Sequence, residues 1–226
     1  MAKGSRGGKR GSQAVVNKGQ AIADFEKKRG ITISQDLKNR MTTDNLYDAT
    51  KRIDDMMDSY PGYFSTVKEI EDYSFTSSYA GMRTDGEVLY LNSKYYNDPK
   101  LMEAMYSYDV SLGFHPAGTT HNDIITHELG HAVSDKIAIN NHLQPEYANL
   151  LIVGRAANEI RANSKSYGYT RKPSEKKLRT EISKYATKNY NETVAEAFAD
   201  YHANKENAKP LSKAIMKEIN RIMGSK

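Results

Sequence analysis

His127-Glu128-Leu129-Gly130-His131 is the stretch around which the rest of this chain is organised. On a helix, residues four apart lie one above the other on the same face, so both imidazoles can point at one metal ion. Glu128 follows His127 directly and can reach over the same ion without binding it. This H-E-x-x-H spacing is typical of helices on which two histidines hold zinc and the glutamate is a general base. The alternative is a surface helix that carries two solvated histidines.

The residues around the motif predict a helix over residues 120–139. Residues 119–123 include Thr, Asn and Asp, which are preferred as helix N-caps. An apolar stripe follows at helical spacing. The stripe consists of Ile124, Ile125, Leu129, Ala132, Val133, Ile137 and Ile139. We therefore expect the two histidines on a partly buried helix, where unpaired imidazoles are costly.

A catalytic zinc ion takes three protein ligands and keeps one open position. The extended motif with a third histidine needs Gly and His three and six residues after the second His, but those positions hold Ser134 and Ile137. A later helix, over residues 191–201, carries Glu192 and Glu196 four apart on one face. We expect Glu192 to be the third ligand and Glu196 to accept a hydrogen bond from a ligand imidazole. The reverse assignment of the two acids is the main alternative.

These motifs resemble the protease domain of anthrax lethal factor and its relatives. The resemblance rests on the H-E-x-x-H pentamer, on Tyr185 and on Glu192-Thr193-Val194-Ala195-Glu196-Ala197-Phe198, and it covers roughly residues 85–201. The relatives include the Pro-Pro endopeptidases and metallopeptidase-like domains of phage head proteins, and all are gluzincins. The resemblance implies that His127, His131 and Glu192 bind zinc and that Glu128 is the base. Tyr185 matches the family tyrosine that stabilises the oxyanion.

The residues before the motif predict a β-hairpin. Residues 80–84 lead into Asp85-Gly86, a favoured two-residue turn, and then into residues 87–92. In gluzincins, a strand just before the zinc helix forms the sheet edge along which the substrate lies extended. The resemblance therefore makes Val88 and Tyr90 candidate substrate-binding residues. The alternative is an ordinary hairpin strand.

Four other histidines are expected to bind no metal, because none forms an i, i+4 pair with the motif. They are His115, His121, His142 and His202.

Further helices are predicted over residues 34–60, 98–108, 146–162 and 174–187, and from residue 209 onward. Together with the hairpin, they predict an α+β, gluzincin-like domain over residues 31–226. We expect a small, mostly antiparallel sheet beside four to six helices, with zinc between them. A chain of 226 residues with 38% apolar content can form one sizeable core.

The amino-acid composition limits the possible metal ligands, the location and the partners of the chain. The chain contains no cysteine, which excludes disulfides and thiolate ligands. It contains no apolar run that matches a signal peptide or a membrane span, so we expect no membrane partner and a cytoplasmic or virion-associated location. Residues 1–30 carry eight Lys or Arg against two acids, more than the whole net charge of +5. We expect a disordered basic tail that binds nucleic acid or an acidic partner, or that only increases solubility.

Together these features predict a zinc-dependent endopeptidase that hydrolyses a protein or peptide substrate with an activated water. Two alternatives stay open. The chain is a structural, virion-associated protein of a phage or mobile element with a metallopeptidase-like domain, or it is a nucleic-acid-associated protein tethered by its basic tail.

Overall fold

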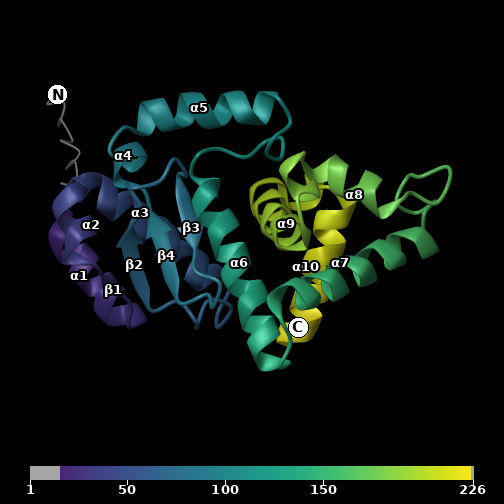
Figure 1. Ribbon diagram of the computed structural model, residues 1–226, viewed down its shortest axis with the longest axis horizontal. Coiled ribbons are helices and arrows are strands. Elements are labelled where there is room, and N and C mark those ends of the chain that lie inside the picture. Colours follow the sequence, from purple (N-terminus) through teal and green to yellow (C-terminus); the bar gives the residue numbers. More distant parts are fainter. Residues whose placement is uncertain (1–15, 225–226) are drawn as a thin grey trace, which may run out of the picture.

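A computed structural model describes residues 16–224 as a mostly helical protein with one small sheet (Figure 1). In chain order the elements are α1 (Lys18–Arg29), β1 (Thr32–Ile33), α2 (Gln35–Arg40), α3 (Thr43–Ser59), β2 (Glu69–Asp72), β3 (Ala80–Met82), β4 (Val88–Leu91), α4 (Ser93–Tyr96), α5 (Pro99–Ser111), α6 (Asp123–Asn140), α7 (Pro145–Ala162), α8 (Glu175–Ile182), the 3₁₀ turn η1 (Tyr185–Thr187), α9 (Tyr190–Asn204), the 3₁₀ turn η2 (Lys205–Asn207) and α10 (Pro210–Met223). The α+β class is confirmed. The helices within the described residues outnumber the four to six that we expected.

Capping side chains decide where several helices begin. The hydroxyls of Ser34 and Thr42 accept hydrogen bonds from the backbone N–H groups of Leu37 and Asn45. Each hydroxyl satisfies an N–H group that has no partner inside its helix. The single helix predicted over residues 34–60 is therefore two helices, α2 and α3.

The sheet contains four strands in the order β1-β2-β4-β3. β1 pairs with β2, and β2 with β4, in parallel, whereas β3 and β4 are antiparallel. The expectation of a mostly antiparallel sheet is therefore wrong. The reason lies in the connections, because helices α2 and α3 separate β1 from β2, and a long crossover lets the next strand run in the same direction.

The hairpin exists, but its strands have other places in the sheet than we predicted. β4 lies between β2 and β3, so the expectation that residues 88–92 form an edge strand is wrong. The edge strand of the hairpin is β3. Its turn also differs, because Gly86 N–H donates to Arg83 C=O at 2.8 Å and Gly86 has a φ of +70°. Thr84 and Asp85 are therefore the central turn residues, and Gly86 follows them in the left-handed conformation.

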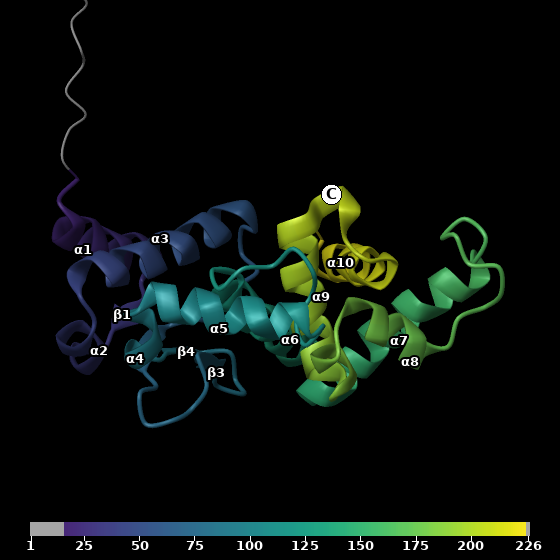
Figure 2. The same ribbon diagram turned by 90° about the horizontal axis from the view of Figure 1, so that it is seen from above.

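Helix α6 lies between the two halves of the molecule. Figure 1 shows the sheet and α1–α3 to one side of α6 and helices α7–α10 to the other. Viewed from above, α1 and α3 lie on one side of the sheet, and α5 crosses over α6 (Figure 2). One cluster of buried apolar side chains extends from Ile22 in α1 to Ile219 in α10. Within the described residues, no helix combines the length and the apolar character that a membrane span needs.

The predicted tail boundary at residue 30 is wrong for residues 18–29, which form α1. Ile22 and Phe25 of this helix are buried against the core. Arg29 forms ion pairs with Asp54 and Asp58 of α3. The remaining part of the predicted tail, residues 1–15, lies outside the described residues.

Candidate metal centre

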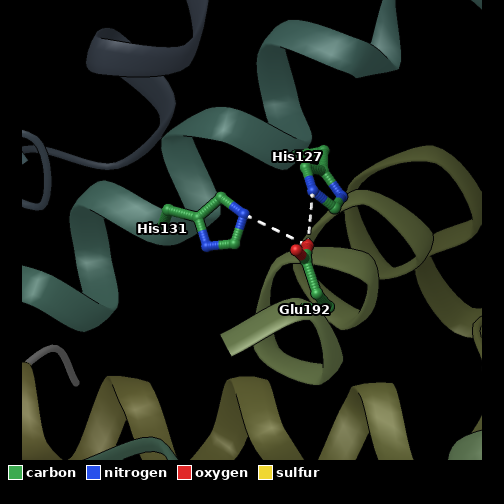
Figure 3. A group of neighbouring side chains, drawn as sticks. All are labelled: His127, His131 and Glu192. Carbon is green, nitrogen blue, oxygen red and sulfur yellow. Dashed lines mark ion pairs between the residues drawn. The ribbon is translucent and has the colours of Figure 1, made fainter. Parts of the chain in front are cut away.

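Three side chains converge between α6 and α9 (Figure 3). His127 Nε2 lies 3.3 Å from Glu192 Oε2, and His131 Nε2 lies 3.4 Å from the same oxygen. Within residues 16–224 these three residues form the one group of metal-ligating side chains whose ligand atoms all lie close enough for a single ion. The i, i+4 pair from α6 and the acid from α9 therefore meet as the sequence predicts.

The donor set and its spacing fit a zinc ion. Two atoms bound to one tetrahedral zinc ion at about 2.0–2.1 Å lie about 3.3–3.4 Å apart, the separation that both histidines show from Glu192 Oε2. That oxygen is buried and has no hydrogen-bond partner within the described part of the chain. An unpartnered buried oxygen is costly. Coordination of a cation would remove this cost.

Charge coupling in the cluster is strong. Burial alone would raise the pKa of Glu192, but the imidazoles of His127 and His131 beside it outweigh burial and lower this pKa below its usual range. Burial alone would lower the pKa of His127, but Glu192 and Glu196 outweigh it and raise that pKa well above 6.5. Metal binding at this cluster is therefore linked to its protonation, because an imidazole that binds a metal ion must be neutral.

Glu196 lies one helical turn after Glu192 and is almost fully buried, with 1% of its surface exposed. Its Oε1 lies 2.9 Å from His127 Nδ1, the ring nitrogen that faces away from Glu192, although this contact lacks the alignment of a good hydrogen bond. The structure thus places Glu192, and not Glu196, against the two Nε2 atoms. This arrangement favours the expected roles of the two acids over the reverse assignment.

The start of α9 is tied to the segment that carries Tyr185. Asn189 caps α9 by accepting a hydrogen bond from Glu192 N–H at 2.8 Å. The Thr193 hydroxyl donates to the C=O of Ala186, next to Tyr185, at 2.7 Å. These bonds hold Tyr185 close to the metal ligands, with its ring centroid 5.9 Å from that of His127.

Two hollows adjoin the candidate site. One, of about 310 Å³, is walled by aromatic rings including Tyr79 and Phe114. The other, of about 520 Å³, is more polar, and burial raises the pKa of Asp135 in its wall to about 7. His127, Glu128 and Tyr185 line both hollows. Glu128 and Tyr185 therefore face the space next to the metal ligands, as their expected roles require.

The remaining expectations separate into two groups. Val88 and Tyr90 belong to the central strand β4 and line neither hollow, whereas Ala80, Gly81 and Met82 of edge strand β3 line the polar one. Within the described residues, His121, His142 and His202 lie outside the group formed by His127, His131 and Glu192.

The sequence prediction missed the place of His115. Its Nδ1 lies 3.0 Å from Glu196 Oε1, so it contacts the site without belonging to the ligand group. Lys188 was also missed, and its Nζ donates a hydrogen bond to the Tyr185 hydroxyl at 3.1 Å. His115 has no periodic spacing to the candidate ligands that would identify it. A signal was present only for Lys188, which is four residues from Glu192 and three from Tyr185 on the printed chain.

No family model matches the chain, and neither curated proteins nor solved structures give a match. The function therefore has to be argued from the site itself.

Proposed function

We propose that this protein is a zinc-dependent endopeptidase of the gluzincin type. The observation that carries the proposal is the convergence of His127 Nε2 and His131 Nε2 on the buried, unpartnered Oε2 of Glu192. Two imidazoles and one carboxylate are a ligand set of catalytic zinc sites, which keep a further position open. The same three residues are the ligands that the resemblance to the lethal factor family implies.

A bound zinc ion supplies a Lewis acid that polarises the scissile carbonyl and increases the acidity of a water molecule. In our proposal the Glu128 carboxylate takes a proton from the attacking water and then gives it to the leaving amine. Tyr185 donates its hydroxyl hydrogen to the oxygen on which negative charge develops. Burial raises the pKa of Tyr185 above its usual value, so the hydroxyl keeps this hydrogen at neutral pH.

Edge strand β3 is our candidate for the substrate-binding strand, in place of residues 88–92. One side of β3 pairs with β4, and no strand pairs with its other side within the described residues. An extended peptide can add to such an edge through main-chain hydrogen bonds. Because Ala80 and His127 line both hollows, a peptide along β3 would lie next to both hollows and to His127.

The test is cleavage of a peptide library by the zinc-loaded chain, followed by mass spectrometry. We expect the wild-type chain to cut, chelation to stop the reaction and added zinc to restore it. Glu128→Gln should retain zinc and lose turnover, which distinguishes this site from a contaminating peptidase. A chain that binds zinc stoichiometrically and cuts no member of a diverse library would contradict the proposal.

The nucleic-acid alternative receives no support from the end of the predicted tail. Lys28 and Arg29 both form ion pairs with Asp54 and Asp58, so their charges are engaged within the fold. A virion-associated role stays a prediction, and co-purification with particles would test it.

A further inference from the structure

Glu196 is shared by two imidazoles. Its Oε1 lies 2.9 Å from His127 Nδ1 and 3.0 Å from His115 Nδ1, while its Oε2 accepts a hydrogen bond from the Ser183 hydroxyl at 2.7 Å. His115 and Ser183 are therefore the two side chains whose hydrogen bonds hold the two oxygens of the buried Glu196 carboxylate in place.

His115 is itself held in a fixed orientation. Its ring stacks on Tyr106 with the centroids 4.8 Å apart and an angle of 12° between the planes. The loop before it is bonded to the segment of Tyr185, because Lys184 N–H donates to Gly113 C=O and Tyr185 N–H donates to Phe114 C=O. A side chain fixed on two sides can orient the group to which it donates.

The chemistry of the carboxylate determines which protons must be present. A carboxylate oxygen that faces an imidazole nitrogen acts as the acceptor, so the proton lies on the imidazole nitrogen that faces it. For His127 this nitrogen is Nδ1, which leaves Nε2 free to bind a metal ion. Loss of the His115 donor would leave Oε1 less constrained and would weaken its control over the orientation of His127.

We propose that His115 is a positioning residue of the metal centre, which fixes the Glu196 carboxylate so that Glu196 orients His127 for zinc. This inference rests on the proposed zinc function. His115 does not touch the ion, because it lies outside the ligand group. Partners of this kind typically change metal affinity by about 10- to 100-fold when they are removed.

The test is zinc affinity measured by competition with a chromophoric chelator, which requires no substrate. We expect His115→Ala to weaken zinc binding by about 10- to 100-fold. His115→Asn should recover most of that loss, because the Asn amide nitrogen has the same bonded position as Nδ1 and can donate to Glu196. The matched control is His121→Ala, since His121 bonds to Glu103 near the same loop but away from Glu196 and should leave zinc affinity unchanged.

A merely structural role is distinguished by a double variant. In a Glu196→Gln chain, replacement of His115 by Ala should cause little further loss of zinc affinity, because both changes interrupt the same chain of contacts. Thermal unfolding of the metal-free variants, measured in parallel, shows whether loss of the stack on Tyr106 destabilises the fold. A further loss in the double variant as large as the loss in the single variant would overturn the inference.

The outcomes separate this inference from the proposed function. A wild-type chain that binds no zinc would refute both. A wild-type chain that binds zinc as tightly as His115→Ala would refute the role of His115 alone. Equal losses in the Ala and Asn variants would also overturn the inference, because they would assign the effect to the ring and not to its Nδ1–H group.

Discussion

Gly130 of α6 packs directly against Ala195 of α9. A β-carbon built on Gly130 would lie 2.9 Å from the Ala195 Cα, which is too short for a real side chain, and 3.1 Å from the Phe198 Cβ, which is a tight contact. The two helices thus touch backbone to backbone in the middle of the H-E-x-x-H motif. This close approach brings Glu192, on α9, within reach of the histidines on α6.

Replacement of Gly130 by Ala should therefore destabilise the protein. Ala is favoured over Gly in a helix by about 1 kcal/mol, but the added methyl group must push α9 away, at a cost of about 1–3 kcal/mol. Urea unfolding of the metal-free chain measures the net loss, and zinc affinity should fall with it. The control is Gly154→Ala in α7, where a β-carbon meets nothing within 4 Å and only the gain in helix propensity remains. Equal effects of the two substitutions would contradict the close packing.

Substitution of Glu192 should reduce zinc affinity much more than substitution of Glu196. Glu192→Ala removes one of three ligands, so we expect no stoichiometric zinc after dialysis. Glu196→Ala removes only the acceptor next to His127 and should weaken binding by about 10- to 100-fold. Metal analysis and chelator competition on the two variants provide a matched pair one helical turn apart. The reverse pattern would exchange the roles of the two acids.

Glu128 and Tyr185 should affect turnover and not the metal. Glu128→Gln is expected to abolish nearly all cleavage at unchanged zinc content. Tyr185→Phe should lower kcat by about ten- to a thousandfold with little change in KM, because its contact forms mainly in the transition state. Tyr190→Phe is the control, since the Tyr190 hydroxyl bonds to Glu175. An unchanged kcat in Tyr185→Phe would make this tyrosine a packing residue.

His202 should make stability depend on pH. Burial lowers its pKa from 6.5 to about 4. A lowered folded-state pKa contributes stability that is complete above pH 6.5 and is lost as the pH falls toward 4. Because His202 is partly exposed, we expect a loss of only about 1–2 kcal/mol. Urea unfolding of the metal-free chain between pH 4 and 8 should show a shallower decline for His202→Gln than for the wild type. Parallel pH profiles would exclude this histidine as the cause.

Helix α1 should contribute to global stability. Phe25 is buried with 5% of its surface exposed, and Phe25→Ala should cost about 3–5 kcal/mol. Lys27→Ala, on the exposed face of the same helix, should change stability by less than about 0.5 kcal/mol. Thermal unfolding of both variants tests the comparison. A Phe25→Ala chain as stable as wild type would support our original assignment of this segment to a tail.

The local features of this protein could be read from its residues. The i, i+4 spacing of His127 and His131 and the apolar stripes of α6, α7 and α9 follow the helical period, which depends only on neighbours within a few residues. The position of Glu192 beside a polar partner was predictable because an acid on a buried helix face requires one. Helix ends were less certain, as the two caps that divide residues 34–60 show.

The contacts between distant segments were decided only by the tertiary structure. The apolar pattern of β4 is the same for an edge strand and for a central strand, so it did not reveal that β3 is the edge. His115 lies in a loop, which has no period, and it meets Glu196 only because the fold brings the loop after α5 against α9. Nothing in the sequence around Gly130 indicated that it packs against Ala195, which only the structure shows. Bringing two distant segments together costs chain entropy, and only the packing of the whole core offsets that cost. A helical period, in contrast, depends on a few adjacent residues.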